Sequence, residues 1–368
     1  MNISPFFSNV RKVNPWRAVL GALVALPAFA QAQIGWSELK GDALNVTLVY
    51  PTDTVSKKTS FHTFELDVAV DAPISAGAPR RLIVLSHGAG GSVFSDHTLA
   101  ATFARAGFVV AQPLHAGDNF RDSAKSGPAT WTTRPAEVTA VIDALAAHPQ
   151  WRSALQLDRV GVHGMSAGGA TALTLAGARW RMLGLLQHCG VQFDADPGFC
   201  FNGLTDPAAQ AQRKAQYLSV KGVPEAFLPA NLKTWNGGKD SEADPRPDTR
   251  VVSVSATVPV SAIFSEESLA RIKVPVGIVA AEADTMVKPA FHSQFVLKHC
   301  KACALIDSVP GASHLDMLHP WPENIAARTA QAQPYGAEVN INFDHTRRLA
   351  AYAKLAQFHR KNLIDSKE

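Results

Sequence analysis

The chain of 368 residues lacks the features that mark several classes of protein. Only 18% of its residues are charged, and its net charge of +4 is too small and too diffuse to indicate a nucleic-acid partner. Beyond the N-terminus there is no apolar run of about 18 residues or more, so no internal membrane span is expected. No segment repeats with a period of about 20–50 residues, which excludes a solenoid. Hydrophobic residues make up 46% of the chain, which is typical of a folded protein with a large core.

The first 32 residues have the pattern of a secretory signal peptide. A basic region at 11–17 precedes an apolar stretch at 19–30, and Ala30-Gln31-Ala32 fits a small-residue cleavage site. The apolar stretch is short for a transmembrane helix, and an uncleaved membrane anchor is the alternative interpretation. We therefore expect residues 33–368 to form a periplasmic or secreted protein, with no stable membrane insertion after signal cleavage.

Only four cysteines occur, and export makes disulfides between them chemically accessible. Four cysteines allow three pairings, of which proximity favours Cys189–Cys200 and Cys300–Cys303. The second pair is a C-x-x-C, a spacing that in a cytosolic protein also suits redox chemistry or half of a zinc site. We interpret it as a structural disulfide. No metal site is expected, because no H-E-x-x-H motif occurs and the His and Cys spacings match no common site.

Short apolar runs alternate with helical patterns along most of the chain, which predicts an α/β fold. The fold would have a mostly parallel central sheet with helices on both faces. Residues 188–249 interrupt the alternation and are expected to form a lid-like insertion. The first two strands are expected to pair as an antiparallel hairpin. The predicted strands are 44–50, 61–70, 82–86, 108–112, 159–163, 251–257, 274–280 and 304–309, and the predicted helices are 97–106, 135–147, 167–178, 266–272, 289–299 and 343–361.

The sharpest chemical signal is Gly164-Met165-Ser166-Ala167-Gly168, which fits G-x-S-x-G. A β-branched strand runs into it and a small-residue helix runs out, the context in which this motif presents a nucleophilic serine. The flanking glycines are needed because a Cβ there would meet neighbouring backbone. The alternative is a Gly-Ser loop that only turns the chain. We predict Ser166 as the nucleophile, with the backbone N–H of Ala167 donating to the oxyanion.

A glycine-rich segment at 86–91 closes an earlier strand and suits an oxyanion-binding loop, whose N–H groups hold the negative charge of acyl transfer. A nucleotide-binding loop is the competing interpretation, but G-x-G-x-x-G would need glycine at Val93. His87 in this segment is expected to order the loop. His115, at the end of the next strand, is either a substrate contact or a loop-ordering hydrogen-bond partner.

A nucleophilic serine needs a base and an acid that orients the base, in the order Ser, Asp or Glu, His for this architecture. Asp284 and His314 each lie just past a predicted strand, where catalytic groups collect in open α/β sheets. We predict Asp284 as the acid and His314 as the base. The rival acid is Glu282 and the rival base is His319. The insertion offers aromatic residues that would either line a pocket or form a small core: Phe193, Phe199, Phe201 and Trp235.

Four stretches carry a resemblance: Ser-His-Gly-Ala-Gly-Gly at 86–91, Gly-Met-Ser-Ala-Gly-Gly at 164–169, Ser-Leu-Ala-Arg-Ile-Lys-Val-Pro-Val at 268–276, and Gly-Ala-Ser-His at 311–314. Together they resemble the α/β-hydrolase superfamily. More narrowly they are similar to secreted bacterial dienelactone-hydrolase-like proteins and to platelet-activating-factor acetylhydrolases. The resemblance implies that the N–H of Ala89 is the other oxyanion donor. Enzymes that open dienelactones use a cysteine nucleophile, whereas this chain has a serine. The family name therefore does not identify the substrate. Met165 stands where lipases often carry histidine, which alters the pocket floor and makes it a candidate substrate contact.

The resulting hypothesis is an exported serine hydrolase that cleaves carboxylic esters, short-chain or lactone-like, through a Ser-His-Asp triad and an acyl-enzyme intermediate. It needs no cofactor, and its partner is a small-molecule ester. An amide or C–C-bond hydrolase on the same fold is the first alternative, since one fold serves many reactions. A catalytically silent binding protein is the second.

Overall fold

The computed structural model describes residues 32–41, 44–235, 247–318, 320–322, 340 and 342–365. These residues belong to one compact unit, Ala32–Glu368. Apart from its last residue, the predicted signal peptide lies outside the described residues, as does His319. None of the helices in the described part of the chain is long and apolar enough to cross a membrane.

A single ten-stranded sheet runs through this unit in the order β10-β9-β8-β7-β5-β6-β2-β1-β4-β3. The six strands from β10 to β6 are parallel, and β2 pairs antiparallel to β6, which confirms the mostly parallel sheet predicted from the alternating pattern. The carboxyl ends of the parallel strands meet at one edge, where sites form in open α/β sheets. The strands are β1 (Gln33–Lys40), β2 (Asn45–Thr52), β3 (Lys57–Phe61), β4 (Phe64–Val70), β5 (Arg80–Ser86), β6 (Val109–Leu114), β7 (Leu155–Met165), β8 (Val251–Thr257), β9 (Val276–Ala281) and β10 (Cys303–Val309).

The predicted N-terminal hairpin is wrong in its pairing. β1 lies between β2 and β4, antiparallel to β2 and parallel to β4. The run predicted as one strand at 61–70 instead turns at His62, where φ is +55°, and forms its own hairpin from β3 and β4. Gly35 allows β1 to lie close to β2, because a Cβ there would stand 2.3 Å from the ring of Tyr50. The pairing of Gly35 with Tyr50 could not be predicted, because no local sequence pattern indicates which strand lies beside β1.

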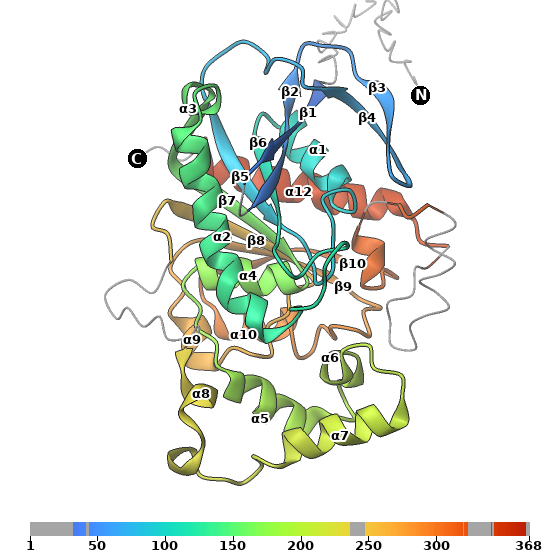
Figure 1. Ribbon diagram of the computed structural model, residues 1–368, viewed down its shortest axis with the longest axis vertical. Helices are drawn as coiled ribbons and strands as arrows, with labels where there is room; N and C mark the ends of the chain where they lie inside the picture. Colours follow the sequence, from blue (N-terminus) through green and yellow to red (C-terminus); the bar gives the residue numbers. More distant parts are fainter. Residues whose placement is uncertain are drawn as a thin grey trace, which may run out of the picture. The chain divides into compact units, whose positions relative to one another are not determined.

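Helices cover both faces of the sheet, as predicted (Figure 1). Both faces of the sheet are apolar, as the alternating side chains of β5 illustrate. Leu82 and Val84 belong to one hydrophobic cluster, and Ile83 and Leu85 belong to the other. The first cluster packs against α2 (Pro128–Ala147), α4 (Ala167–Leu175), α9 (Glu266–Ala270) and α10 (Ser293–His299). The second cluster packs against α1 (His97–Arg105) and α12 (His345–Leu363). The short helices α3 (Trp151–Ala154) and η3 (Leu315–Met317) complete the framework.

Helix α2 begins seven residues earlier than the sequence predicts, at Pro128 rather than Pro135. A proline suits the first position of a helix because its missing N–H has no acceptor there. The structure gives that position to Pro128 and keeps Pro135 inside the helix. The two turns gained in this way include Arg134, whose side chain is important at the site described below.

The segment 182–233, which overlaps the predicted insertion at 188–249 and is called the insertion below, is mainly helical. It comprises α5 (Met182–Gln192), α6 (Pro197–Phe201), α7 (Pro207–Leu218), η1 (Glu225–Phe227) and α8 (Ala230–Lys233). These helices group together in Figure 1, coloured green to yellow. The disulfide Cys189–Cys200 joins α5 to α6, and Cys300–Cys303 closes the turn before β10. Both pairings are the ones that proximity in the sequence favoured.

Candidate active site

Ser166 lies at a sharp turn between β7 and α4, with φ of +55° and ψ of −117°. Such a conformation is strained for a residue with a side chain and is retained only where the surroundings enforce it. The surroundings here are tight, since a Cβ on Gly164 would lie 1.9 Å from the carbonyl oxygen of Gly168. A Cβ on Gly168 would lie 1.9 Å from the carbonyl oxygen of Ser86. The two motif glycines therefore let the chain cross the end of β5 and present Ser166.

The predicted acid and base are in contact. Nδ1 of His314 lies 2.7 Å from Oδ2 of Asp284, and both side chains are buried. The other carboxylate oxygen of Asp284 accepts hydrogen bonds from the N–H groups of Met286 and Val287 at 2.9 and 2.8 Å. These bonds fix the carboxylate in the turn after β9, facing the turn after β10 that carries His314. The rival acid Glu282 instead accepts a hydrogen bond from Ser308 on the exposed side of the same turn.

A cavity of about 720 Å³ brings the predicted groups together. Ser166, His314, Ala89, Ala167 and Met165 all line it. Because the first N–H groups of a helix have no intrahelical acceptor, the N–H of Ala167 at the start of α4 is available to a ligand. Much of the remaining wall is aromatic: Phe64, Phe94, Phe120, Trp131, Phe199, Tyr217 and Trp321.

The insertion supplies one side of this cavity and also forms a small core of its own. Phe199 lines the cavity, as one of the two alternatives for the insertion's aromatic residues predicts. Phe193 and Phe201 follow the other alternative, because their rings pack edge to face at 4.2 Å beside the Cys189–Cys200 disulfide. Trp235 does neither and lies under the guanidinium group of Arg181 at 4.4 Å.

His115 is fully buried and is not among the residues that line the cavity. Its Nε2 lies 2.8 Å from Oγ of Ser86, and its Nδ1 lies 2.5 Å from Oε2 of Glu137. Its backbone N–H donates to Nε2 of His87 at 3.2 Å. Burial lowers the pKa of both histidines well below the usual value, so both are neutral near pH 7. Of the two roles considered for His115, these contacts favour the loop-ordering one, and His87 contacts the same loop.

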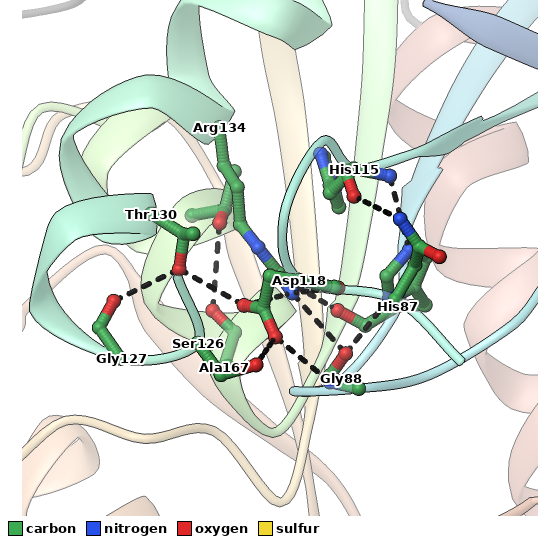
Figure 2. Close-up of polar contacts among 12 residues, drawn as sticks. His87, Gly88, His115, Asp118, Ser126, Gly127, Thr130, Arg134 and Ala167 are labelled. Atoms are coloured by element: carbon green, nitrogen blue, oxygen red, sulfur yellow. Dashed lines mark hydrogen bonds and ion pairs between the residues drawn. The ribbon is translucent and has the colours of Figure 1, made fainter. Parts of the chain in front are cut away.

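Sequence reasoning missed a buried ion pair beside the glycine-rich loop. Nη2 of Arg134 on α2 lies 2.7 Å from Oδ2 of Asp118, and neither side chain has exposed surface (Figure 2). Burial opposes ionisation of Asp118, but the Arg134 charge and hydrogen bonds from Ser126, Gly90 and Thr130 lower its pKa below the usual value. In the sequence Arg134 stands one residue before the predicted helix 135–147, and nothing there marked it as an ion-pair partner. Nothing in the sequence distinguished Asp118 from other loop aspartates.

The described residues offer one cluster with metal-ligand spacing, His188 with Cys189 and Cys200. Both sulfur atoms of this cluster are joined in a disulfide. A metal binds the deprotonated thiolate, which a disulfide does not provide. The cluster therefore does not fit a metal ion.

Comparison with known proteins bears on the fold. The alpha/beta hydrolase family model matches residues 83–327, the stretch that contains Ser166, Asp284 and His314. Among solved structures, a ferulic acid esterase from Streptomyces cinnamoneus is similar, with a TM-score of 0.54 and 16% sequence identity over 94% of each chain. No curated protein sequence matches. Since the family model covers well over half of the chain, this protein belongs to the alpha/beta hydrolase family.

Proposed function

We propose that the protein is a serine esterase that hydrolyses carboxylic esters. One observation carries the proposal: Ser166, at a strained strand-to-helix turn, and His314, hydrogen-bonded to a fixed carboxylate of Asp284, line the same cavity. A base beside a serine, oriented by a third group, is the arrangement that activates a serine oxygen.

In the proposed reaction, Nε2 of His314 takes the proton of Ser166 as Oγ attacks the ester carbonyl. Asp284 holds Nδ1–H of His314, which leaves Nε2 free to accept that proton. The backbone N–H groups of Ala89 and Ala167 hold the negative charge on the carbonyl oxygen. The proton then passes to the leaving alcohol, and a water molecule activated by the same histidine releases the acyl group from Ser166.

The cavity supports a substrate larger than the short-chain or lactone-like esters expected from the sequence. Its volume of about 720 Å³ is of the size that encloses a drug-sized ligand. Aromatic side chains such as Phe94, Trp131 and Phe199 form its wall, and such walls pack well against flat or branched apolar groups. The similar ferulic acid esterase is named for an aromatic ester. We therefore propose esters with a bulky apolar or aromatic group on one side of the bond.

The test is hydrolysis of p-nitrophenyl esters from acetate to decanoate, together with methyl esters of aromatic acids. Ser166→Ala is compared with wild type, and Ser153→Ala, at an exposed serine whose Oγ donates to the carbonyl oxygen of Gln150, serves as the matched control. Loss of the nucleophile is expected to lower the rate by about 10³–10⁶, and the control by less than about twofold. Equal rates in wild type and Ser166→Ala would exclude the proposal. An amide panel in the same assay tests the amidase alternative.

Export is part of the proposal and rests on the pattern in residues 1–32. Mass spectrometry of the protein expressed with its own N-terminus in a bacterial host tests it. Export predicts a mature chain that begins at Gln33, recovered outside the cytoplasm with both disulfides formed. A full-length chain recovered in the cytoplasm would contradict this part of the proposal.

A further inference from the structure

The loop that follows β5 carries Ala89, and the buried ion pair lies directly behind it. We propose that Asp118 and Arg134 are positioning residues that fix the direction of the Ala89 N–H and so build the oxyanion hole. This inference rests on the proposed serine-esterase function and deepens it. Figure 2 shows Arg134 reaching from its helix toward Asp118 and toward the loop at Gly88.

Arg134 holds the carbonyl side of the loop. Its Nη1 donates to the carbonyl oxygen of His87 at 2.6 Å, and its Nη2 donates to that of Gly88 at 3.2 Å. A peptide unit is planar and trans, so its C=O and N–H point in opposite directions. Because the Gly88 carbonyl faces Arg134, the N–H of the same peptide unit, which belongs to Ala89, faces away from Arg134.

The same loop also borders the nucleophile and the cavity. A Cβ built on Gly88 would lie 3.4 Å from Cβ of Ser166, so this part of the loop passes beside the serine. Gly88 and Ala89 both line the cavity, whereas Arg134 and Asp118 do not. The ion pair therefore does not contact the cavity. It affects the substrate only through the Gly88–Ala89 peptide unit that it orients.

Asp118 holds the amide side of the same loop. Its Oδ1 accepts the N–H of Gly90 at 2.8 Å and a hydrogen bond from Ser126, and its Oδ2 accepts the hydroxyl of Thr130 at 2.9 Å. The peptide units on both sides of Ala89 are thus tied to one ion pair. The N–H groups of Gly90 and Gly91 are taken by Asp118 and by the Gly88 carbonyl, which leaves the N–H of Ala89, a residue that lines the cavity, for a ligand.

A planar guanidinium is needed for this arrangement. Arg134 uses two nitrogens on one fork to reach two successive carbonyls and the Asp118 carboxylate. Lysine keeps the charge but is a single compact donor without that fork. Arg134→Lys therefore preserves the net charge of the pair while it releases at least one carbonyl of the loop.

Steady-state kinetics on the best ester from the panel form the first part of the test. An oxyanion donor acts mainly in the transition state, so a displaced donor lowers kcat more than it changes KM. We expect Arg134→Lys to lower kcat by about 10–10³, within the range for loss of one oxyanion donor, with KM changed by less than about threefold. A boronic acid that forms a tetrahedral adduct on Ser166 is expected to bind more weakly by a similar factor. Thr130→Val, which removes one support of Asp118, is the milder variant and should give a smaller change in the same direction.

The second part of the test does not depend on activity. The backbone amide signals of Ala89 and Gly90 in NMR spectra report the orientation of the loop in the folded variant. We expect both signals to shift in Arg134→Lys. Arg250→Lys is the matched control, because Arg250 also forms a close ion pair, with Asp248, but away from the cavity. It should leave kcat and both amide signals unchanged.

The outcomes separate the two proposals. A fall in kcat at nearly constant KM, together with shifted loop amides, supports the positioning role. Wild-type kcat per folded molecule in Arg134→Lys and in Thr130→Val, while Ser166→Ala is inactive, overturns the positioning role and leaves the esterase intact. A lower melting temperature with unchanged kcat does the same, because it assigns the pair to stability alone. Inactivity of wild type on every ester overturns the proposed function and this inference with it.

Discussion

Acid is expected to destabilise this protein through two histidines buried between the sheet and α12. Nδ1 of His163 lies 2.7 Å from Oγ of Ser255, and the same oxygen lies 2.7 Å from Nε2 of His359. Nδ1 of His359 in turn contacts Oγ of Ser253 at 2.9 Å. Neither histidine has exposed surface. Burial lowers the pKa of each to about 3, because the charged form would lose its hydration, and for His163 the neighbouring His359 adds to the effect.

The direction and the size of the effect follow from linkage. Below pH ~6.5 the unfolded chain binds a proton at each histidine, whereas the folded chain does not until the pH approaches 3. The stability that the two neutral histidines contribute is therefore fully present above pH ~6.5, and this contribution is lost as the pH falls toward 3. Between about pH 7.5 and pH 5, each histidine lowers the free energy of unfolding by about 2 kcal/mol. Together His163 and His359 remove about 4 kcal/mol, a large part of the roughly 5–15 kcal/mol that stabilises a typical protein.

Urea unfolding followed by tryptophan fluorescence at several pH values between about 7.5 and 5 measures this loss. His359→Gln replaces one titrating ring with a neutral hydrogen-bonding side chain. We expect its stability to fall by about 2 kcal/mol less than that of wild type over the same pH range, whatever its stability at pH 7.5. His62→Asn is the control, because His62 is exposed and asparagine tolerates its positive φ. Identical pH slopes for wild type and His359→Gln would refute the reasoning.

Three further predictions follow from the site and the insertion. Asp284→Asn should lower kcat for ester hydrolysis by about 10⁴ with little change in folding, because the carboxylate sets the tautomer of His314. The kcat of Glu282→Gln should stay within about twofold of wild type. The reverse result would identify Glu282 as the acid. Gly168→Ala should abolish activity and lower the melting temperature, because its Cβ would stand 1.9 Å from a backbone oxygen. Gly190→Ala, whose Cβ would meet its nearest neighbour at 3.5 Å, should be tolerated, and equal stability of the two variants would contradict the packing argument. Replacing both residues of the Cys189–Cys200 disulfide by serine should lower the free energy of unfolding by about 3 kcal/mol, and no change in urea unfolding would show that this cross-link does not constrain the unfolded chain.

Local steric rules explain why part of the site could be predicted. The turn at Ser166 follows from glycines within two residues of it, and its geometry depends on backbone atoms of the adjoining strand and helix. Asp284 and His314 were predicted to lie together because both follow buried strands, and parallel strands bring their carboxyl ends to one edge; the structure places their side chains in contact. His115 shows the limit of this rule. It also follows a strand, but its side chain lies beside Ser86 at the start of the glycine-rich loop and does not line the cavity.

The sequence by itself determined the alternation of strands and helices, the turn at Ser166, the placement of Asp284 and His314 after neighbouring strands, and the pairing of neighbouring cysteines. These features depend on residues that are close in the chain, where sterics and hydrophobic periodicity act directly. Only the tertiary structure decided that β1 lies between β2 and β4, and that Phe199 lines the cavity while Phe193 does not. It alone paired Asp118 with Arg134, because the partner of a buried charge is chosen by packing between separate elements, and no pattern within either element records it.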